Sequence, residues 1–296
     1  LHALHKLGCH GLLADEMGLG KTVQTLALIM GNKEKDLPDL VTCPASVVPV
    51  WVREAKERFP RLKVRILSKE NQFSEEFENC LWVASYTQLR RHRSLLEKFK
   101  FRYAVLDEAQ LIKNPKAKVT QTCLSIDAKH RLALSGTPIE NTALDLWTIF
   151  RFLMPGLLGS RKDLEKNLTE APEDTIRLLR RQVTPFVLRR IKSEVATELP
   201  PKLETELPCP LNDEQRKEYR KLTEGAIQEH GEDLQAALKE APTHVFSLLT
   251  RLRQTCCDLG LLPWRDGLPS TGAKGDLLLE RLKDLSSSGA KVIVFS

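Results

Sequence analysis

The stretch Leu13–Thr22, LADEMGLGKT, decides the fold of this chain. It follows a short apolar run and precedes an amphipathic one, so we expect a strand, a glycine-rich loop and a helix in that order. Such a loop holds nucleotide phosphates, because its backbone N–H groups and the helix N-terminus point at the anion. In the pattern GxxxxGK[ST], Asp15 takes the place of the first glycine, while Gly18 and Gly20 still allow close backbone approach.

The residues of this loop have separate predicted roles. Lys21 reaches the β- and γ-phosphates, and the hydroxyl of Thr22 is a ligand of Mg²⁺. The predicted nucleotide-binding residues are Asp15, Glu16, Met17, Gly18, Leu19, Gly20, Lys21 and Thr22. The alternative is an incidental glycine-rich turn, which the flanking strand and helix patterns disfavour.

A second motif, DEAQ at Asp107–Gln110, ends an apolar run. Two carboxylates at the end of a buried strand are costly unless a cation or catalysis uses them. We assign Asp107 to Mg²⁺, through water, and Glu108 to the general base that polarises the attacking water. An acidic pair at a strand end is by itself a common solvated turn. Together with the phosphate loop and Lys21, it predicts a nucleoside triphosphatase that uses ATP and Mg²⁺.

A third motif, SGTP at 135–138, follows an apolar run and precedes a helical pattern. One interpretation is a hydroxyl-bearing linker between the acidic pair and whatever the enzyme moves. The other is a plain turn between a strand and a helix.

Short β-branched runs alternate with amphipathic stretches through the first 155 residues. The predicted strands are 11–14, 40–43, 64–67, 81–85, 103–107 and 131–135. The predicted helices are 21–30, 50–58, 88–99, 117–127 and 144–153. This alternation indicates an α/β fold, with βαβ units and a parallel sheet covered on both faces. All three motifs fall at predicted strand ends, where such sheets bind ligands.

From residue 156 the strand signals fade and charged amphipathic helices follow, at 173–182, 213–228 and 243–257. A helix at 276–285 then precedes a strand at 291–295. The predicted division is a nucleotide-binding lobe at 1–155, a helical region at 156–260 and the start of a second lobe at 261–296. We also expect the chain to be a piece of a longer protein.

Composition narrows the class of protein. The 296 residues are 42% hydrophobic and 28% charged, which is typical of a soluble globular protein, and the net charge of +6 favours an acidic partner such as nucleic acid. The seven cysteines form no CxxC pair or zinc-type cluster, so we interpret them as reduced thiols of an intracellular protein. No apolar stretch approaches the ~20 residues that cross a bilayer, so no membrane partner is expected.

These motifs, in this order, resemble the SWI/SNF-type ATPases of helicase superfamily two. The segments that carry the resemblance are LADEMGLGKT, VTCPASVVPVW (41–51), DEAQLIKN (107–114), LSGTPIEN (134–141), FVLRRIKSEVATELPPK (186–202), LTRLRQTCC (249–257) and KVIVFS (291–296). The resemblance covers essentially the whole chain. It implies an ATP-dependent translocase on double-stranded DNA, built from two RecA-like lobes with helical insertions, which remodels or displaces a DNA-bound protein or transcription complex.

The resemblance also implies roles for individual residues. The predicted contacts to the DNA backbone, independent of base sequence, are Thr42, Pro44, Ser46, Ser85, Tyr86, Thr87, Arg189 and Arg190. A helix cap is an equal interpretation of Ser85–Thr87, and a solvated basic face is an alternative for the two arginines. The residues expected to couple nucleotide state to DNA grip are Gln110, Ser135, Gly136 and Thr137. Trp51 is expected to pack in the core.

Departures from the family pattern add further expectations. The adenine-reading segment ahead of Leu1 and the later motifs of the second lobe, with their arginine finger, lie outside this chain. We therefore expect hydrolysis by this fragment alone to be weak, since an arginine finger contributes roughly 10³–10⁵ in rate. Cys256, Cys257 and Asp258 stand where nucleosome-remodelling members carry Asn-His-Pro, which favours a prokaryotic member. The expected location is then the cytoplasm or nucleoid, or the nucleus for a eukaryotic protein.

Two other functions stay open at this level. One is an RNA helicase of the same superfamily, which the DEAQ and LRRIKSEV motifs disfavour. The other is a nucleotide-binding scaffold that does not hydrolyse ATP, although Lys21, Thr22, Asp107 and Glu108 are all present.

Overall fold

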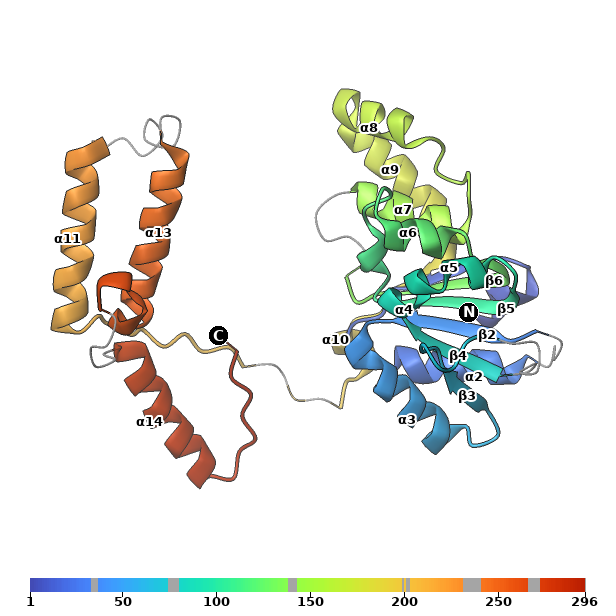
Figure 1. Ribbon diagram of the computed structural model, residues 1–296, viewed down its shortest axis with the longest axis horizontal. Helices are drawn as coiled ribbons and strands as arrows, with labels where there is room; N and C mark the ends of the chain where they lie inside the picture. Colours follow the sequence, from blue (N-terminus) through green and yellow to red (C-terminus); the bar gives the residue numbers. More distant parts are fainter. Residues whose placement is uncertain are drawn as a thin grey trace. The chain divides into compact units, whose positions relative to one another are not determined.

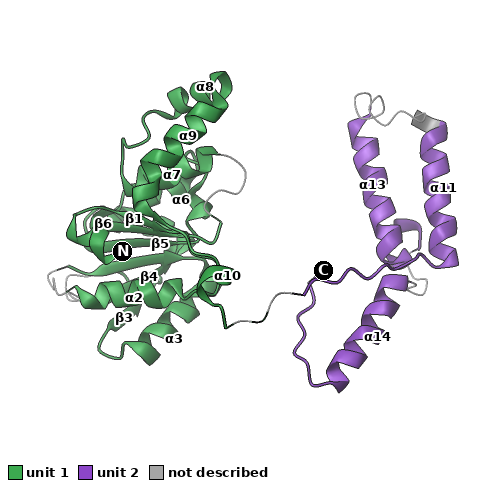
Figure 2. Ribbon diagram, turned by 180° about the vertical axis from the view of Figure 1, so that it is seen from behind, with its two compact units in different colours: residues 1–200 green, residues 201–296 purple. Residues whose placement is uncertain are grey.

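The computed structural model describes residues 1–32, 37–73, 80–137, 143–198, 200, 203–230, 241–265 and 272–295. It contains two compact units, residues 1–200 and 201–296, which Figure 2 colours separately. Each unit is described by itself below. The three-part division predicted from the sequence, with boundaries at 155 and 260, stays a prediction.

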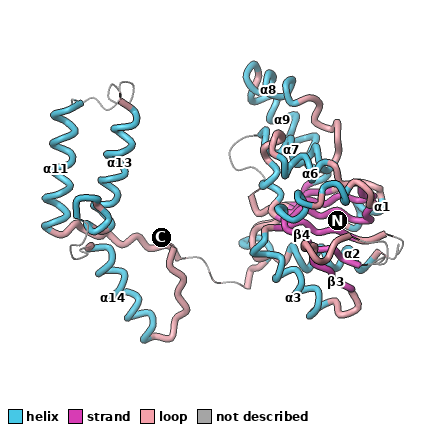
Figure 3. The backbone as a smooth tube through the Cα atoms, in the orientation of Figure 1, coloured by secondary structure: helices cyan, strands magenta, loops and turns pink. Residues whose placement is uncertain are grey.

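A parallel sheet forms the centre of the first unit (Figure 3). Its strand order is β3-β4-β2-β5-β6-β1-β7. Its strands are β1 (Gly11–Leu13), β2 (Asp39–Cys43), β3 (Lys63–Ile66), β4 (Cys80–Ser85), β5 (Lys100–Asp107), β6 (Asp127–Leu134) and β7 (Val187–Leu188). Every pairing in the sheet is parallel. This confirms the predicted α/β class, and six of the seven strands lie where the sequence placed them.

Helices cover both faces of the sheet (Figure 1). The helices of this unit are α1 (His2–Lys6), α2 (Lys21–Gly31), α3 (Val48–Arg58), α4 (Tyr86–Arg91), α5 (Arg93–Leu96), α6 (Lys118–Leu124), α7 (Ala143–Leu153), α8 (Arg161–Glu170), α9 (Pro172–Val183) and α10 (Lys192–Val195). Residues of α2 and α3 share one apolar cluster with the sheet, and residues of α4 to α7 share the other. Strands buried on both faces explain the continuous apolar runs of β2, β4 and β5.

Some predicted boundaries were wrong. The single helix predicted at 88–99 is two short helices, α4 and α5, because His92 leaves helical geometry at φ −102°, ψ 23°. The helix predicted at 117–127 ends at Leu124, and β6 begins at Asp127. The first half of β6 is polar, so periodicity missed it; backbone pairing with β5 from Lys100 onward defines that strand.

The second unit is helical among its described residues. It contains α11 (Asp213–His230), α13 (Pro242–Cys257), α14 (Ala273–Ser287) and the 3₁₀ turns η5 (Leu259–Leu261) and η6 (Pro263–Arg265). The helices agree with the sequence prediction. The strand predicted at Lys291–Phe295 is wrong, since that segment is an exposed loop. A strand requires a paired neighbour, and no described segment of this unit is a strand.

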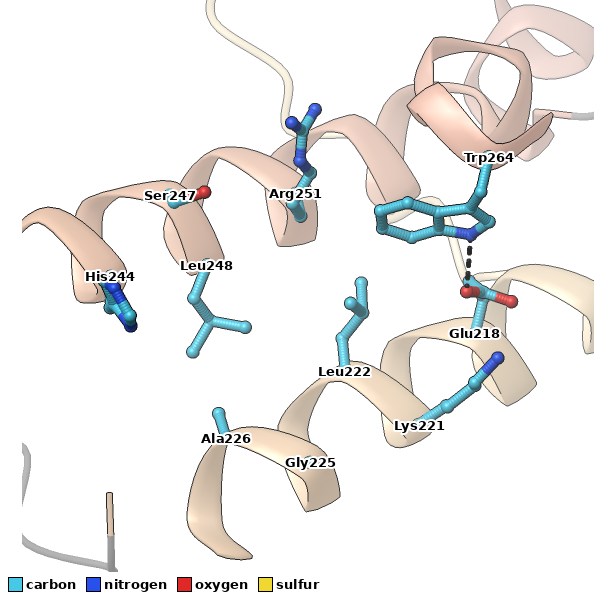
Figure 4. Close-up of a pocket in the computed structure, with 10 residues that line it drawn as sticks. All are labelled: Glu218, Lys221, Leu222, Gly225, Ala226, His244, Ser247, Leu248, Arg251 and Trp264. Atoms are coloured by element: carbon cyan, nitrogen blue, oxygen red, sulfur yellow. Dashed lines mark hydrogen bonds between the residues drawn. The ribbon is translucent and has the colours of Figure 1, made fainter. Parts of the chain in front are cut away.

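The helices α11 and α13, together with Trp264, line an open groove of about 730 Å³ (Figure 4). Trp264 lies at one end of it, where its indole N–H donates to the Glu218 carboxylate at 3.0 Å. The guanidinium of Arg251 lies 5.9 Å from the centre of the same ring. In the described parts of the chain, every helix is too short or too polar to cross a membrane.

A buried ion pair joins the amino ends of β2 and β5. The guanidinium of Arg102 donates to both carboxylate oxygens of Asp39, at 2.9 and 2.6 Å, and to the carbonyls of Ile29 and Asn32 at the end of α2. The backbone N–H of Tyr103 donates to the same carboxylate at 3.2 Å. This network satisfies polar groups that would be costly to bury alone.

Replacing Arg102 by Met should lower the free energy of unfolding by about 3–5 kcal/mol, because it leaves the Asp39 carboxylate buried and unpaired. Urea denaturation measures the loss. The matched control is Arg161→Met, which breaks an exposed pair with Glu165 and should cost no more than about 0.5 kcal/mol. Equal losses in the two variants would contradict the structural role of the buried pair.

Burial also controls the reactivity of the thiols. It raises the pKa of Cys43 to about 12 and that of Cys80 to about 11, whereas Cys257 is exposed. Since the thiolate is the reactive form, alkylation of the folded protein at pH 9.0, the ordinary thiol value, should modify Cys257 and leave Cys43 and Cys80 protected. Peptide mass spectrometry before and after urea unfolding checks this. Early labelling of Cys43 would contradict it.

Candidate active site

The three sequence motifs meet at the carboxyl edge of the sheet. The strands that carry them, β5, β6 and β1, are neighbours, and Leu134 pairs in register with both Asp107 and Leu13. The phosphate loop follows β1, the acidic pair ends β5, and Ser135 follows β6. The geometry thus confirms the expectation that these motifs share one edge.

The phosphate loop uses glycine where the backbone requires it. Gly18 has φ +89° and Gly20, the residue before α2, has φ +74°, conformations that side-chain-bearing residues rarely adopt. The ammonium of Lys21 lies inside the loop, where it donates to the carbonyls of Asp15 at 2.8 Å and Glu16 at 3.4 Å. A loop, a lysine and a helix N-terminus in this arrangement form an anion-binding site.

Asp15, which stands in the place of a glycine, has a fully buried side chain with an ion-pair partner. The guanidinium of Arg190 donates to both of its carboxylate oxygens, at 3.1 and 2.5 Å, and Gln24 donates at 3.2 Å. Burial opposes the charge of Asp15, but the hydrogen bonds from Arg190 and Gln24 and the charge of Arg190 outweigh it and lower the pKa of the carboxyl. The departure from the glycine pattern is therefore structural: Asp15 anchors another segment.

That segment is the short strand β7 and the residues after it. The N–H of Ala14 donates to Leu188, and the N–H of Glu16 donates to the carbonyl of Arg190 at 2.9 Å. The N–H of Lys192 donates to the Glu16 carboxylate at 2.7 Å. Residues 188–192 are thus hydrogen-bonded along one side of the phosphate loop.

The two arginines of this segment differ. Arg190, predicted to contact DNA, is held against Asp15 and also donates to the side-chain oxygen of Gln24 at 2.8 Å. Arg189 is exposed. Sequence reasoning predicted both as DNA contacts and missed the pair with Asp15, because the partners are 175 residues apart in the chain.

Asp107 is buried at the end of β5, and donors hold it on several sides. The indole N–H of Trp51 donates to Oδ2 at 2.8 Å, the N–H of Glu108 donates to Oδ1 at 3.0 Å, and the hydroxyl of Tyr86 donates to the backbone carbonyl at 2.7 Å. Burial and the charge of Glu108 raise the pKa of Asp107, against the opposite effects of the Trp51 hydrogen bond and the charge of Lys21. A nearby cation would favour the charged form.

Glu108 has φ +51°, the one positive value among the described non-glycine residues. Such a conformation costs of order 1–3 kcal/mol and is concentrated at functional sites. It starts a chain of hydrogen bonds: Gln110 donates to the Glu108 carboxylate at 2.8 Å, Ser135 donates to Gln110 at 2.7 Å, and the N–H of Thr137 donates to the Ser135 hydroxyl at 3.1 Å. The predicted coupling residues are therefore physically connected to the predicted general base.

Gly136, the remaining predicted coupling residue, packs against the phosphate loop. A Cβ atom there would lie 2.9 Å from Cγ of Met17. Residues 138–142, which include the end of the third motif, lie outside the described residues.

The residues present fit a magnesium ion that also binds phosphate. The Asp107 carboxylate has donors on both oxygens, but no basic side chain of the described residues is hydrogen-bonded to it. Nor do the described residues contain a group of three or more His, Cys, Asp and Glu side chains suited to a metal. Mg²⁺ is typically bound through one or two protein oxygens together with phosphates and water, as a site of Thr22 and Asp107 would require.

The predicted DNA contacts at the end of β2 and just after it differ in exposure. The Thr42 side chain is buried, and its hydroxyl has no hydrogen-bond partner among the described residues. Pro44 is half-buried and Ser46 is exposed. Only Ser46 among these three presents a hydroxyl to solvent.

The second group of predicted contacts follows β4. Ser85 caps α4 by accepting from the N–H of Gln88 at 3.2 Å, which is the cap that the sequence left open as an alternative. Tyr86 is buried against Asp107, whereas Thr87 is exposed. A phosphate contact through a side-chain hydroxyl is thus available at Thr87 and not at Tyr86.

Comparison with known proteins gives consistent matches. The model of the SNF2-related domain matches residues 1–261. An uncharacterized ATP-dependent helicase of Mycoplasma pneumoniae is 34% identical, over 97% of this chain and 28% of that protein. The TATA-binding protein-associated factor MOT1 of Saccharomyces cerevisiae is 33% identical, over 86% of this chain and 16% of that protein.

A solved structure agrees with these sequence matches. The Sulfolobus solfataricus SWI2/SNF2 ATPase core in complex with double-stranded DNA is 32% identical, with a TM-score of 0.62. The match covers 97% of this chain and 62% of that chain.

Replacing Arg190 by Met should lower the free energy of unfolding by roughly 1–3 kcal/mol at neutral pH, because it removes the main donors to a buried carboxylate. The pKa of Asp15 is lowered in the folded protein, so the stabilisation is present above the ordinary value of 3.8 and is lost as the pH falls through the lowered value. Urea denaturation across this pH range measures both effects. Arg189→Met is the control and should change the free energy of unfolding by no more than about 0.5 kcal/mol. If the difference in unfolding free energy between Arg190→Met and the wild type does not depend on pH, the ion pair is contradicted.

Proposed function

Because the chain belongs to the SNF2-related family, we propose that it is the nucleotide-binding part of a motor that hydrolyses ATP to move along double-stranded DNA. The chain spans 28% of the mycoplasma helicase and 16% of MOT1, so the activity proposed is that of the whole protein. The observation that carries the proposal is the hydrogen-bonded chain from Glu108 through Gln110 to Ser135, beside a phosphate loop.

The residues at this edge of the sheet divide the work of ATP hydrolysis among phosphate binding, metal binding and proton transfer. The loop N–H groups and Lys21 bind the phosphates, and the hydroxyl of Thr22 and the carboxylate of Asp107 would hold Mg²⁺. Bound Mg²⁺ neutralises the charge that develops on the phosphates. Glu108 lies next to Asp107 and accepts the proton of the attacking water. Its backbone conformation and its bond from Gln110 set the direction of that carboxylate.

The linked residues also support coupling between hydrolysis and movement. Ser135 and Gly136 follow β6, and they contact Gln110 and Met17 respectively. A change at the nucleotide phosphates can therefore reach the end of β6 through the acidic motif or through the phosphate loop. This is the role proposed for the coupling residues.

Three observations support duplex DNA as the partner. The chain carries a net charge of +6. The side chains of Ser46, Thr87 and Arg189 are exposed. The similar Sulfolobus core was solved in complex with double-stranded DNA. The contacts would be to phosphates and independent of base sequence. Remodelling of a DNA-bound protein is proposed by analogy with MOT1, a TATA-binding protein-associated factor. An intracellular location, at the nucleoid or in the nucleus, follows from a DNA partner.

ATP turnover by the full-length protein should rise several-fold when duplex DNA is added, and the stimulation should weaken steeply with salt, because phosphate contacts release counterions. A phosphate-release assay with duplex DNA, RNA and no polynucleotide measures this. Stimulation by RNA alone would favour an RNA helicase. Absence of turnover under all three conditions would favour a scaffold.

Replacing Glu108 by Gln should lower the rate of ATP turnover by at least roughly 10²-fold, because it removes the general base. ATP binding should persist, because the side chain keeps its shape. Nucleotide binding is measured by equilibrium titration alongside the turnover assay. Glu97→Gln, at an exposed ion pair with Arg93, is the matched control and should leave both quantities unchanged. Normal turnover in Glu108→Gln would overturn the assignment.

A further inference from the structure

Trp51 lies in the first turns of α3 and is fully buried. Its ring belongs to the apolar cluster between the sheet and the helices α2 and α3, together with Val41, Cys43 and Val105. A phenylalanine would also supply an apolar ring at this position. What tryptophan adds is the indole N–H, a donor that needs a partner when it is buried.

The partner of that N–H is the carboxylate of Asp107, at 2.8 Å. The N–H of Glu108 takes the other carboxylate oxygen, at 3.0 Å. A carboxylate held by one donor on each oxygen cannot rotate about its last bond without losing both hydrogen bonds, yet each oxygen keeps a further lone pair. The indole and the Glu108 N–H therefore set the plane of the carboxylate and leave it able to accept a cation or its bound water.

The backbone of Asp107 is held independently of the side chain. The hydroxyl of Tyr86 donates to its carbonyl at 2.7 Å, and the strand pairs with β6 through Leu134. Loss of the indole N–H therefore leaves the backbone of Asp107 held and removes one of the two donors to its carboxylate, which can then rotate while it keeps the bond from the Glu108 N–H. This separates an effect on orientation from an effect on folding.

We propose that Trp51 is a positioning residue, whose indole N–H orients the Asp107 carboxylate for Mg²⁺. The inference rests on the proposed function, in which Asp107 holds the magnesium of Mg·ATP. Groups that orient metal ligands in this way typically contribute 10- to 100-fold to metal affinity.

The position of Trp51 also connects two parts of the proposed motor. The predicted contact Ser46 lies in the 3₁₀ turn η1 (Ala45–Val47), which leads directly into α3, and Trp51 is the fourth residue of α3. One continuous segment thus carries a proposed DNA contact, Ser46, and the hydrogen-bond donor to a proposed magnesium ligand, Asp107.

The first test is spectroscopic and uses the full-length protein without turnover. The ¹⁵N–¹H indole signal of Trp51, assigned by its absence in Trp51→Phe, should shift when Mg²⁺ is added to the ADP-bound protein. The indole signals of Trp147 and Trp264, which donate to Gly159 and Glu218, should stay in place. The Trp51 signal should also shift in Asp107→Asn. A Trp51 signal that does not shift with Mg²⁺ would overturn the proposal. If Trp51→Phe proves unstable, Trp51→Tyr provides the assignment instead.

The second test measures the metal directly. In Trp51→Phe, the Mg²⁺ concentration needed for half-maximal ATP turnover should rise by about tenfold or more. The Mn²⁺ affinity of the ADP-bound protein, measured by electron paramagnetic resonance, should fall by a similar factor. ADP affinity in the absence of divalent metal should be unchanged. Trp82→Phe is the matched control, because Trp82 of β4 is as fully buried as Trp51 but belongs to the cluster on the opposite face of the sheet.

The outcomes separate the two proposals. Equal metal dependence in wild type and Trp51→Phe would overturn the role of Trp51 while leaving the motor intact. A parallel loss of metal-free ADP affinity, or the same change in Trp82→Phe, would show a general packing effect and also overturn it. If wild-type protein shows no DNA-stimulated turnover but its Trp51 signal still responds to Mg²⁺, the proposed motor function fails and the positioning role stands.

Discussion

Parallel pairing of β5, β6 and β1 is the constraint on which the site depends. It brings the ends of three distant segments to one edge, with Leu134 in register between Leu13 and Asp107. The side chains of Lys21, Asp107 and Glu108 are thereby brought to the same edge of the sheet. Burial of the strands on both faces keeps that edge rigid, because helices pack on each side of the sheet.

Polar groups at this edge are held by partners drawn from other elements. Asp15 is charged and buried because Arg190 reaches it from the segment after β7. Asp107 is oriented by Trp51 of α3 and held at its carbonyl by Tyr86 of α4. Each pair makes a functional residue depend on a different part of the first unit. Unpaired, these buried groups would destabilise the fold, so stability and function impose the same contacts.

The differences between prediction and structure have physical causes. Periodicity found β2, β4 and β5, since each of these buried parallel strands contains an apolar run, and it missed β7, which is only two residues long and is defined by its pairing with β1. It also predicted a strand at Lys291–Phe295 from composition, although a strand forms only against a neighbour. Trp51 packs in the core as predicted, but its bond to Asp107 was missed, and so was the bond of Tyr86, which was predicted to contact DNA. Side-chain partners that are distant in the chain leave no local signal.

Local sequence by itself determined the α/β class, the phosphate loop, the acidic pair and the third motif, because these depend on residue types at short spacing. Only the tertiary structure decided that Asp15 pairs with Arg190, that Gln110 joins Glu108 to Ser135, and that Trp51 donates to Asp107. Each of these contacts joins side chains through space, and its geometry follows from strand order and helix packing. Spacing along the chain specifies which groups are present, whereas the fold specifies which groups meet.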